Sequence, residues 1–362
     1  MYGEHDYEVL TSAREGLQRQ EDHFGSKQRH DTDGYNIIPF GYCTYRNRSD
    51  DGKFAFNINT ISEKAIVSKF YPVFRFTNAN STFMAEFLNS SPRVKKKLSV
   101  LAVGTSQVVL SFEALEAAKF DLPCKDEQDK IAAFLECLNA RIENQRTLVV
   151  ALKKYKRGVV RTLLSPKRCS IKNVKWTTSR IGDIGTFIKG APLSKADISL
   201  EGTPFILYGE LYTTYSEVIS NVVRKTQASA DKQYYSQIGD VIIPTSGETP
   251  EEISTASCVM LPDIILAGDL NIYRCTQVDG RIMSYILNHV VNDRIARIAQ
   301  GKSVVHVQAA EISKIEITYP DPFSQKTIIA ILAAISDRID QSNAELRLLH
   351  ELRKALLQKL FI

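Results

Sequence analysis

The strongest constraint on the fold is an internal duplication with a constant, gap-free offset of 197 positions. Residues Pro123–Leu164 recur in residue type and register as Pro320–Phe361, and Gln128 and Gln325 are one matched pair. The repeats of solenoid proteins are only about 20–50 residues long. The offset therefore indicates a duplicated domain, with each copy followed by a long helix.

Both repeated segments carry apolar residues at steps of three and four, which is the 3.5-residue period of a coiled-coil seam. The predicted seam residues are Ile131, Leu135, Leu138, Ile142, Val149, Leu152, Val159 and Leu163 in the first segment and Ile328, Leu332, Ile335, Ile339, Leu346, Leu349, Leu356 and Leu360 in the second. Polar residues interrupt both seams at equivalent positions, Gln145 with Ser342 and Lys156 with Arg353.

A helix over residues 126–164 would be about 57 Å long at about 1.5 Å per residue. That length exceeds what one small domain can cover. We therefore expect the two helices to pack as an antiparallel coiled coil that sets the spacing of two similar domains. In the alternative, each helix covers its own globular domain.

Length and composition are those of an ordinary globular protein. The 362 residues are 44% hydrophobic and 24% charged. A chain of this length is expected to form about two or three domains. No apolar run of about 18 residues and no signal-peptide pattern occur, so we expect a cytoplasmic protein without a membrane span. The six cysteines form no CxxC pair, which favours reduced thiols and no metal site.

The positive charge is concentrated in the first long segment. Residues 124–170 carry 11 Lys and Arg against 5 Asp and Glu, which accounts for the net charge of +5. The basic run consists of Lys153, Lys154, Lys156, Arg157, Arg161, Lys167 and Arg168. This run has two interpretations. It can be a solvated helix C-terminus, where basic residues interact favourably with the helix dipole, or a surface that contacts phosphates.

The remaining segments have the patterns of mixed α and β structure. Short β-rich runs are expected at 203–208, 241–244, 257–261, 271–275, 304–307 and 315–319, with a helix over 282–300. The first copy repeats this order, because Phe83–Leu88 with Asn89 match Ile282–Leu287 with Asn288. The predicted fold class is α+β: two similar mixed α/β domains, each followed by a long helix. The predicted boundaries are 1–123, 124–168, 169–320 and 321–362.

These residues resemble a known family. The segments LPCKDEQDKIAAFLECLNARIENQRTLVVALKKYKRGVVRTLLSP and SQKTIIAILAAISDRIDQSNAELRLLHELRKALLQKLFI resemble the two conserved helical regions of the specificity subunit of Type I restriction-modification systems. WTTSRIGDIGTFIKGAPLSKADI, at Trp176–Ile198, resembles the opening of that family's target recognition domains.

The resemblance implies a non-catalytic subunit that recognises a split target in double-stranded DNA, one half per domain. It also implies that the paired helices dock two methyltransferase subunits and, through them, restriction subunits. No cofactor is then expected on this chain, and S-adenosylmethionine is expected on the methyltransferase partner.

The first domain departs from this pattern. Subtracting the offset from Trp176 places the counterpart of that opening segment near position −21, before Met1. We therefore expect the first recognition domain to lack its first strands. Two alternative functions follow: a scaffold that binds methyltransferase subunits, or a self-associating protein that recognises one half-site.

Catalytic motifs are not recognisable. No G-x-G-x-x-G cradle follows a strand, and Gly301-Lys302-Ser303 follows a predicted helix where a phosphate-binding loop needs a strand. The six histidines have no metal-ligand spacing, and we expect His289 and His306 to be structural. The sequence favours a protein that is not an enzyme.

The candidate DNA contacts are polar and basic residues in turns that recur in both copies, because such residues bind base edges and phosphates. In the second domain they are Lys189, Gly190, Ser194, Lys195, Thr245, Ser246, Gln300, Gly301, Lys302 and Ser303, and in the first they are Tyr45, Arg46, Arg48, Thr105, Ser106 and Gln107. For each residue taken alone, the alternative is an ordinary polar turn.

Overall fold

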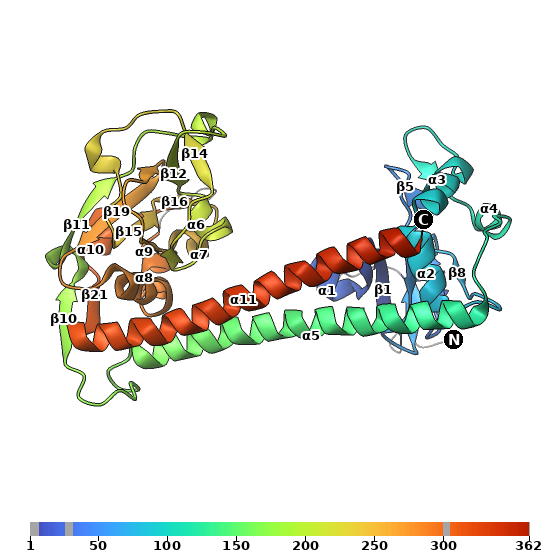
Figure 1. Ribbon diagram of the computed structural model, residues 1–362, viewed down its shortest axis with the longest axis horizontal. Helices are drawn as coiled ribbons and strands as arrows, with labels where there is room; N and C mark the ends of the chain where they lie inside the picture. The colour runs from blue at the N-terminus through green and yellow to red at the C-terminus, as the bar shows by residue number, and fades with distance from the viewer. Residues whose placement is uncertain (1–6, 26–31, 300–304, 362) are drawn as a thin grey trace. The chain divides into compact units, whose positions relative to one another are not determined.

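The computed structural model describes residues 7–25, 32–299 and 305–361, which form two compact units (Figure 1). Unit 1 contains residues 1–147 and 343–362, and unit 2 contains residues 148–342. The division falls within both long helices, α5 (Lys125–Leu163) and α11 (Pro322–Leu360), which have 39 residues each. Each unit therefore holds one mixed α/β domain together with part of each helix.

Unit 1 contains two principal sheets, with strand orders β2-β1-β7-β3 and β6-β4-β8, and a β5-β9 pair. Its strands are β1 (Glu8–Ala13), β2 (Gly16–Arg19), β3 (Asn36–Ile37), β4 (Cys43–Tyr45), β5 (Arg48–Ser49), β6 (Phe56–Ile58), β7 (Ala65–Val67), β8 (Val73–Phe74) and β9 (Val108–Val109). Its shorter helices are α1 (Gln20–Phe24), α2 (Ser81–Ser90), α3 (Pro92–Leu101) and α4 (Phe112–Glu116).

Unit 2 is built around a five-stranded sheet of order β11-β19-β15-β17-β13, with a β14-β12-β18 sheet and the pairs β10-β21 and β16-β20. Its strands are β10 (Trp176–Arg180), β11 (Gly185–Lys189), β12 (Thr203–Leu207), β13 (Val218–Ile219), β14 (Arg224–Thr226), β15 (Asp240–Pro244), β16 (Ser246–Gly247), β17 (Ser257–Val259), β18 (Ile265–Ala267), β19 (Leu270–Cys275), β20 (Val305–His306) and β21 (Glu316–Pro320). Its shorter helices are α6 (Glu210–Thr213), α7 (Pro250–Ile253), α8 (Gly280–His289), α9 (Asn292–Ile298) and α10 (Ala309–Ser313), with 3-10 turns η1 (Ile181–Asp183), η2 (Lys195–Asp197) and η3 (Lys232–Tyr234).

The predicted strand runs are present, but the helix expected over 282–300 is two helices, α8 and α9. The break falls at Val290 and Val291, whose backbone N–H groups both donate to the carbonyl of Ile286. Two adjacent β-branched residues favour such an interruption because their side chains are restricted in a helix. Helix α8 is buried along its length against β15 and β17.

The start of each long helix is held by a buried glutamine that makes the same contacts in both copies. Gln128 Nε2 donates to the carbonyl of Pro123 at 2.9 Å, and Gln325 Nε2 donates to the carbonyl of Pro320 at 2.8 Å. Each glutamine also accepts through Oε1 from the backbone N–H of the N-cap residue of an earlier domain helix: Asn80 of α2 at 3.0 Å and Asp279 of α8 at 2.8 Å. The duplication therefore extends to individual hydrogen bonds.

An asparagine at the end of α2 and of α8 gives the second such correspondence. Asn89 accepts from the N–H of Phe56 at 2.9 Å and donates to its carbonyl at 2.8 Å. Asn288 makes the same two bonds with Ala256, at 3.1 and 2.6 Å. These contacts align β6 with β17 residue by residue, with Phe56 equivalent to Ala256.

The two long helices run antiparallel in the stretches that each unit contains. In unit 1, Leu138 and Ile142 of α5 pack with Leu349 of α11, and Arg141 forms an ion pair with Glu345 at 2.9 Å. In unit 2, the core contains Val160 and Leu163 of α5, Leu164 directly after that helix, and Ile328 and Leu332 of α11.

The apolar seam shifts near the C-terminal end of each long helix. Val160, Leu357 and Phe361 are buried next to the predicted Val159, Leu356 and Leu360. Val159 and Leu356 are half-buried, and Leu356 packs on the helix seam, whereas Leu360 is 38% exposed. The steps lengthen to four at these ends because the helices there pack on the globular domains.

Two differences between the copies are clear in the part of the chain that the structure describes. Among the described residues, unit 1 has no counterpart of β10 and β11, and residues 119–123, which match β21, form no strand. Unit 1 also has a tight turn between β1 and β2 where unit 2 has a longer connection between β12 and β14 that contains β13. No helix in the described part of the chain is long and apolar enough to cross a membrane.

Candidate nucleic-acid interface

A groove of about 1070 Å³ in unit 2 gathers four of the predicted DNA contacts. It is lined by Lys189, Gly190, Ser194 and Thr245, together with residues of β19 and β20. Lys189 and Ser194 are exposed, and Thr245 is half-buried. Two segments that are distant in sequence, residues 189–194 and the turn after β15, thus meet at one open surface.

The Lys189–Gly190 turn depends on a close backbone approach. A Cβ at Gly190 would lie 2.7 Å from the carbonyl oxygen of Gly268. The Gly190 N–H donates to the carbonyl of Leu270 at 2.9 Å, so the chain leaves β11 alongside β19. Glycine at this position lets the turn place Lys189 at the edge of the groove.

Ser194 and Lys195 lie at the start of the η2 turn. The Ser194 hydroxyl accepts from the N–H of Ala196 at 3.2 Å, and Asp197 accepts from the Ser194 N–H at 2.8 Å, which forms a capping box. This local bonding accounts for the serine. Lys195 is exposed, but it does not line the groove.

The turn after β15 holds Thr245 and Ser246 in different environments. Ser246 is 4% exposed, and its hydroxyl donates to Asp269 Oδ2 at 3.1 Å. Ser246 was predicted to contact DNA, but it is a buried structural residue, because its hydroxyl is used within the fold. Nearby, Asn271 lines the groove at 3% exposure, and its Nδ2 has no hydrogen-bond partner among the described residues.

The first copy presents its candidates on equivalent turns. The N–H of Leu110 donates to the carbonyl of Asn47 at 2.9 Å, and the N–H of Val307 donates to the carbonyl of Thr245 at 3.1 Å. Arg46 and Arg48, which flank Asn47, are both exposed. The guanidinium carbon of Arg48 lies 5.2 Å from the ring centre of Phe70.

Tyr45 does not belong to this surface. Its side chain is fully buried, its hydroxyl donates to the carbonyl of Leu110 at 2.9 Å, and burial raises the pKa of the phenol. The prediction that Tyr45 contacts DNA is therefore replaced by a core role. The alternation of the strand points Tyr45 inward and Arg46 outward.

The turn that carries Thr105, Ser106 and Gln107 is exposed in unit 1. A Cβ at Gly104 would lie 2.2 Å from the carbonyl oxygen of Gln107, and its φ is +141°, so this tight turn requires glycine. Gln107 Nε2 donates to Asp50 Oδ1 at 2.9 Å, which joins this turn to the segment after β5. The matching candidates Gln300, Gly301, Lys302 and Ser303 lie outside the described residues.

Lys156, one of the two polar residues that interrupt the first helical seam, belongs to an ion-pair site that the sequence did not reveal. Lys156 Nζ lies 2.8 Å from Glu217 Oε2, and His289 Nε2 lies 2.7 Å from Glu217 Oε1. Burial alone would raise the pKa of Glu217, but the His289 hydrogen bond and the Lys156 charge outweigh it and lower the pKa to about 2. The Lys156 ammonium also lies 5.3 Å from the ring centre of Tyr285.

Arg353 is the polar residue of the α11 seam that matches Lys156, and it also pairs with a carboxylate. It contacts Glu86 of α2 and donates from Nε to Asn139 of α5 at 2.6 Å. Glu86 precedes Asn89 by three residues, as Tyr285 precedes Asn288. Each seam cation therefore ties a long helix to the domain of its own unit. Of the basic run, Lys156 is buried and the other six residues are exposed.

Comparison with known proteins identifies a family whose model matches most of this chain. The model of the Type I restriction modification DNA specificity domain matches residues 4–152 and 173–350. The fold resembles the S subunit of a Type I restriction-modification system from M. genitalium, with a TM-score of 0.59 and 17% identity over 99% of this chain and 89% of that one.

A second solved chain comes from work on complex assembly and conformational transition of the type I R-M system. Its TM-score to this chain is 0.57 at 17% identity, and the match covers 92% of this chain and 84% of that one. A search of curated proteins gives no match. The two family matches follow the duplication, and the chain belongs to the Type I restriction-modification DNA specificity family.

Proposed function

We propose that this chain is a non-catalytic specificity subunit that recognises a bipartite target in double-stranded DNA, with one half-site bound by each unit. The observation that carries the proposal is the repetition of the candidate turns. The Leu110–Asn47 and Val307–Thr245 hydrogen bonds place polar and basic residues at equivalent positions of two similar domains. Two equivalent protein surfaces are suited to two separate half-sites.

The chemistry of the two surfaces supports contact with DNA. Lys189 supplies a charge for a phosphate, and Thr245 supplies a hydroxyl group for a phosphate or a base edge. In unit 1, the exposed guanidinium groups of Arg46 and Arg48 offer the donor geometry that pairs with phosphates and with guanine.

We further propose that α5 and α11 bind two methyltransferase subunits, which carry the S-adenosylmethionine and join the restriction subunits to the complex. Exposed apolar side chains on the helices support this role. Leu348 and Leu352 lie one turn apart on α11 and are 65% and 49% exposed, and Phe134 of α5 is 50% exposed. Surface apolar residues grouped in this way are typical of association surfaces.

Footprinting of DNA by the chain reconstituted with its methyltransferase tests the bipartite proposal. Two protected half-sites separated by an unprotected spacer are expected. One half-site repeated about a dyad would instead support two self-associated chains, and no protection would support a methyltransferase-binding scaffold.

The docking proposal has its own test. Leu348→Glu with Leu352→Glu should abolish co-purification with the methyltransferase, because the change places two charges on the apolar surface. Gln358→Glu, at an exposed position on the same helix, is the matched control. Unchanged co-purification of the double variant would place the docking surface elsewhere.

A further inference from the structure

Helix α3 of unit 1 has an exposed basic surface. The helix contains no acidic residue, and its basic residues are all exposed: Arg93, Lys95, Lys96 and Lys97. Val94 and Leu98 are buried on its other side, and the Ser91 hydroxyl caps its start by accepting from the N–H of Val94 at 3.4 Å. The helix is therefore held by its apolar side and presents its charges to solvent.

Lys97 has a structural role that the duplication repeats. Its ammonium group donates to the carbonyl of Lys119, as the guanidinium group of Arg294 in α9 donates to the carbonyl of Glu316 at 3.0 Å. Both members of each pair are related by the offset of 197 positions. This contact aligns α3 with α9 and shows which cation of the helix both copies use in the fold.

The charges at two other positions of α3 occur in unit 1 alone. In the same alignment, Arg93 corresponds to Val290 and Lys96 to Asp293. Neither Arg93 nor Lys96 forms an ion pair with any residue that the structure describes. Lys95 instead lines a cavity whose wall contains carboxylate groups. Arg93 and Lys96 are therefore the cations of α3 that no contact within the fold explains.

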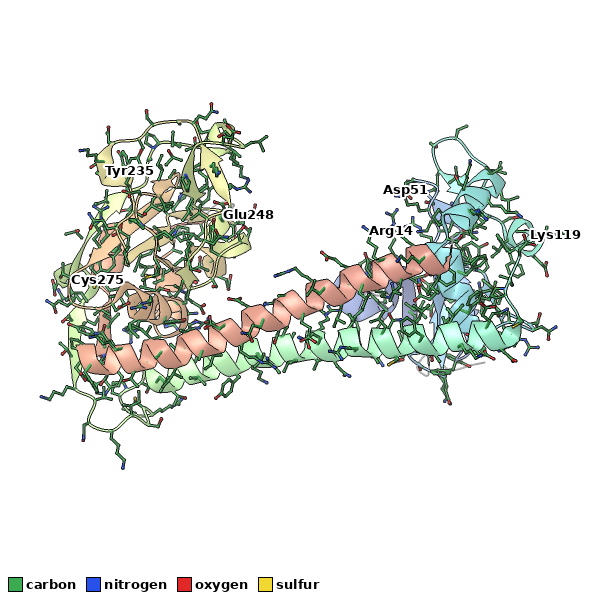
Figure 2. All side chains as sticks on the ribbon, viewed as in Figure 1. Arg14, Asp51, Lys119, Tyr235, Glu248 and Cys275 are labelled. Carbon is green, nitrogen blue, oxygen red and sulfur yellow. The ribbon has the colours of Figure 1, made fainter. Side chains whose placement is uncertain are left out.

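Lys96 lies near the loop that follows β5. Ser99 is three residues after Lys96, so the two side chains are neighbours on one side of α3. A Cβ at Gly52, in the loop, would lie 3.4 Å from Ser99 Oγ. Figure 2 labels Asp51 of this loop, whose carboxylate is paired with Arg14 at 2.9 Å. The loop thus packs against α3 with this carboxylate already paired.

The same loop connects α3 with the candidate DNA contacts of unit 1. Asp50 of the loop accepts from Gln107 of the exposed turn at 2.9 Å. Arg48, in β5, pairs with Val109, which lies just after that turn. Helix α3 itself ends at Leu101, shortly before the turn. Strand β5, the exposed turn and α3 therefore form one surface.

We propose that α3 of unit 1 binds the phosphate backbone of double-stranded DNA, with Arg93 and Lys96 each contacting a phosphate. This inference rests on the DNA recognition proposed above and adds a phosphate contact that the counterpart helix of unit 2 does not provide. Phosphate contacts set the position of a protein on the duplex, whereas base contacts specify the sequence. Helix α3 therefore positions the DNA on unit 1 and leaves the choice of bases to other residues.

The test is a binding titration of the chain, reconstituted with its methyltransferase, against a duplex that this complex selects from a pool of random sequences. Each phosphate contact adds about 0.9 to the slope of log affinity against log salt. Arg93→Gln with Lys96→Gln should therefore lower the slope by about 2 and weaken binding at least about tenfold. Arg93→Lys with Lys96→Arg, which keeps both charges, should retain the slope. All variants should select the same bases.

The matched control removes the same charge from unit 2. Lys225→Gln with Lys232→Gln changes two exposed residues and should leave the slope unchanged, with the folding of every variant checked by circular dichroism. An unchanged slope in the α3 glutamine variant, an equal fall in the control, or a change in the selected bases overturns the proposal and leaves DNA recognition in place. Failure of the unchanged complex to bind any duplex overturns the proposed function together with this inference.

Discussion

Replacement of Glu217 by Gln should destabilise unit 2 by about 3 kcal/mol at pH 7. The Glu217 carboxylate pairs with both Lys156 and His289. Although burial alone would raise it, these two partners lower the pKa of Glu217 from 4.5 to about 2. At about 1.4 kcal/mol per pKa unit, that difference corresponds to about 3 kcal/mol of preferential binding of the ionised form in the folded state. Removal of one partner from a buried ion pair costs a similar amount, about 3–5 kcal/mol.

The same pKa fixes the direction of the pH dependence. The folded-state pKa is below the unfolded value, so this stabilisation is complete well above pH 4.5 and is lost as the pH falls towards about 2. About 2 kcal/mol of it should be lost between pH 7 and pH 3. Glu217→Gln should remove this part of the acid sensitivity, because the amide does not titrate in that range.

Urea denaturation followed by tryptophan fluorescence measures the effect in unit 2 alone. The chain has one tryptophan, Trp176, which lies in β10 and pairs with Pro320 of β21. Glu201→Gln, at an exposed position in unit 2, is the control and should change the unfolding free energy by less than about 0.5 kcal/mol. A loss below about 1 kcal/mol for Glu217→Gln at pH 7, or an unchanged difference between pH 7 and pH 3, would refute the reasoning.

Three further predictions address the helices, the buried glutamines and the DNA surface. Leu138→Ala should cost about 2–4 kcal/mol in unit 1 because Leu138 is 8% exposed, whereas Leu352→Ala, at 49% exposure, should change stability by less than about 0.5 kcal/mol in urea denaturation followed by circular dichroism. Gln325→Ala should shift the tryptophan-detected transition by about 2–3 kcal/mol because it leaves two buried polar groups unpaired, while Gln128→Ala, in the other unit, should leave that transition in place. Lys189→Ala should lower the slope of log affinity against log salt by about 1 if the ammonium group binds a phosphate, and an unchanged slope in a binding titration would exclude that contact.

The repeated parts of the structure were predictable because they depend on local patterns. The 3.5-residue period marked both long helices, the strand runs at β12, β15, β17 and β19 were present, and the glutamine pair at 128 and 325 marked equivalent helix starts.

The details of the candidate surface depended on contacts that no local pattern contains. Ser246 and Tyr45 have the residue types of a polar turn, but each donates its hydroxyl hydrogen to a group distant in sequence. The ends of the seam moved by one residue because the helices meet domains there, and the packing surface of a domain has no heptad period.

The duplicated pair of α/β domains with two matched long helices could be predicted from the amino-acid sequence, since periodicity and repeated residue types encode local backbone structure. The role of the polar residues Lys156 and Arg353 in the helix seams depends on tertiary contacts. Lys156 meets Glu217 from 61 positions away, and Arg353 meets Glu86 from 267 positions away. A buried charge requires an opposite charge at contact distance, and the length of the β12–β14 connection determines which segment supplies it.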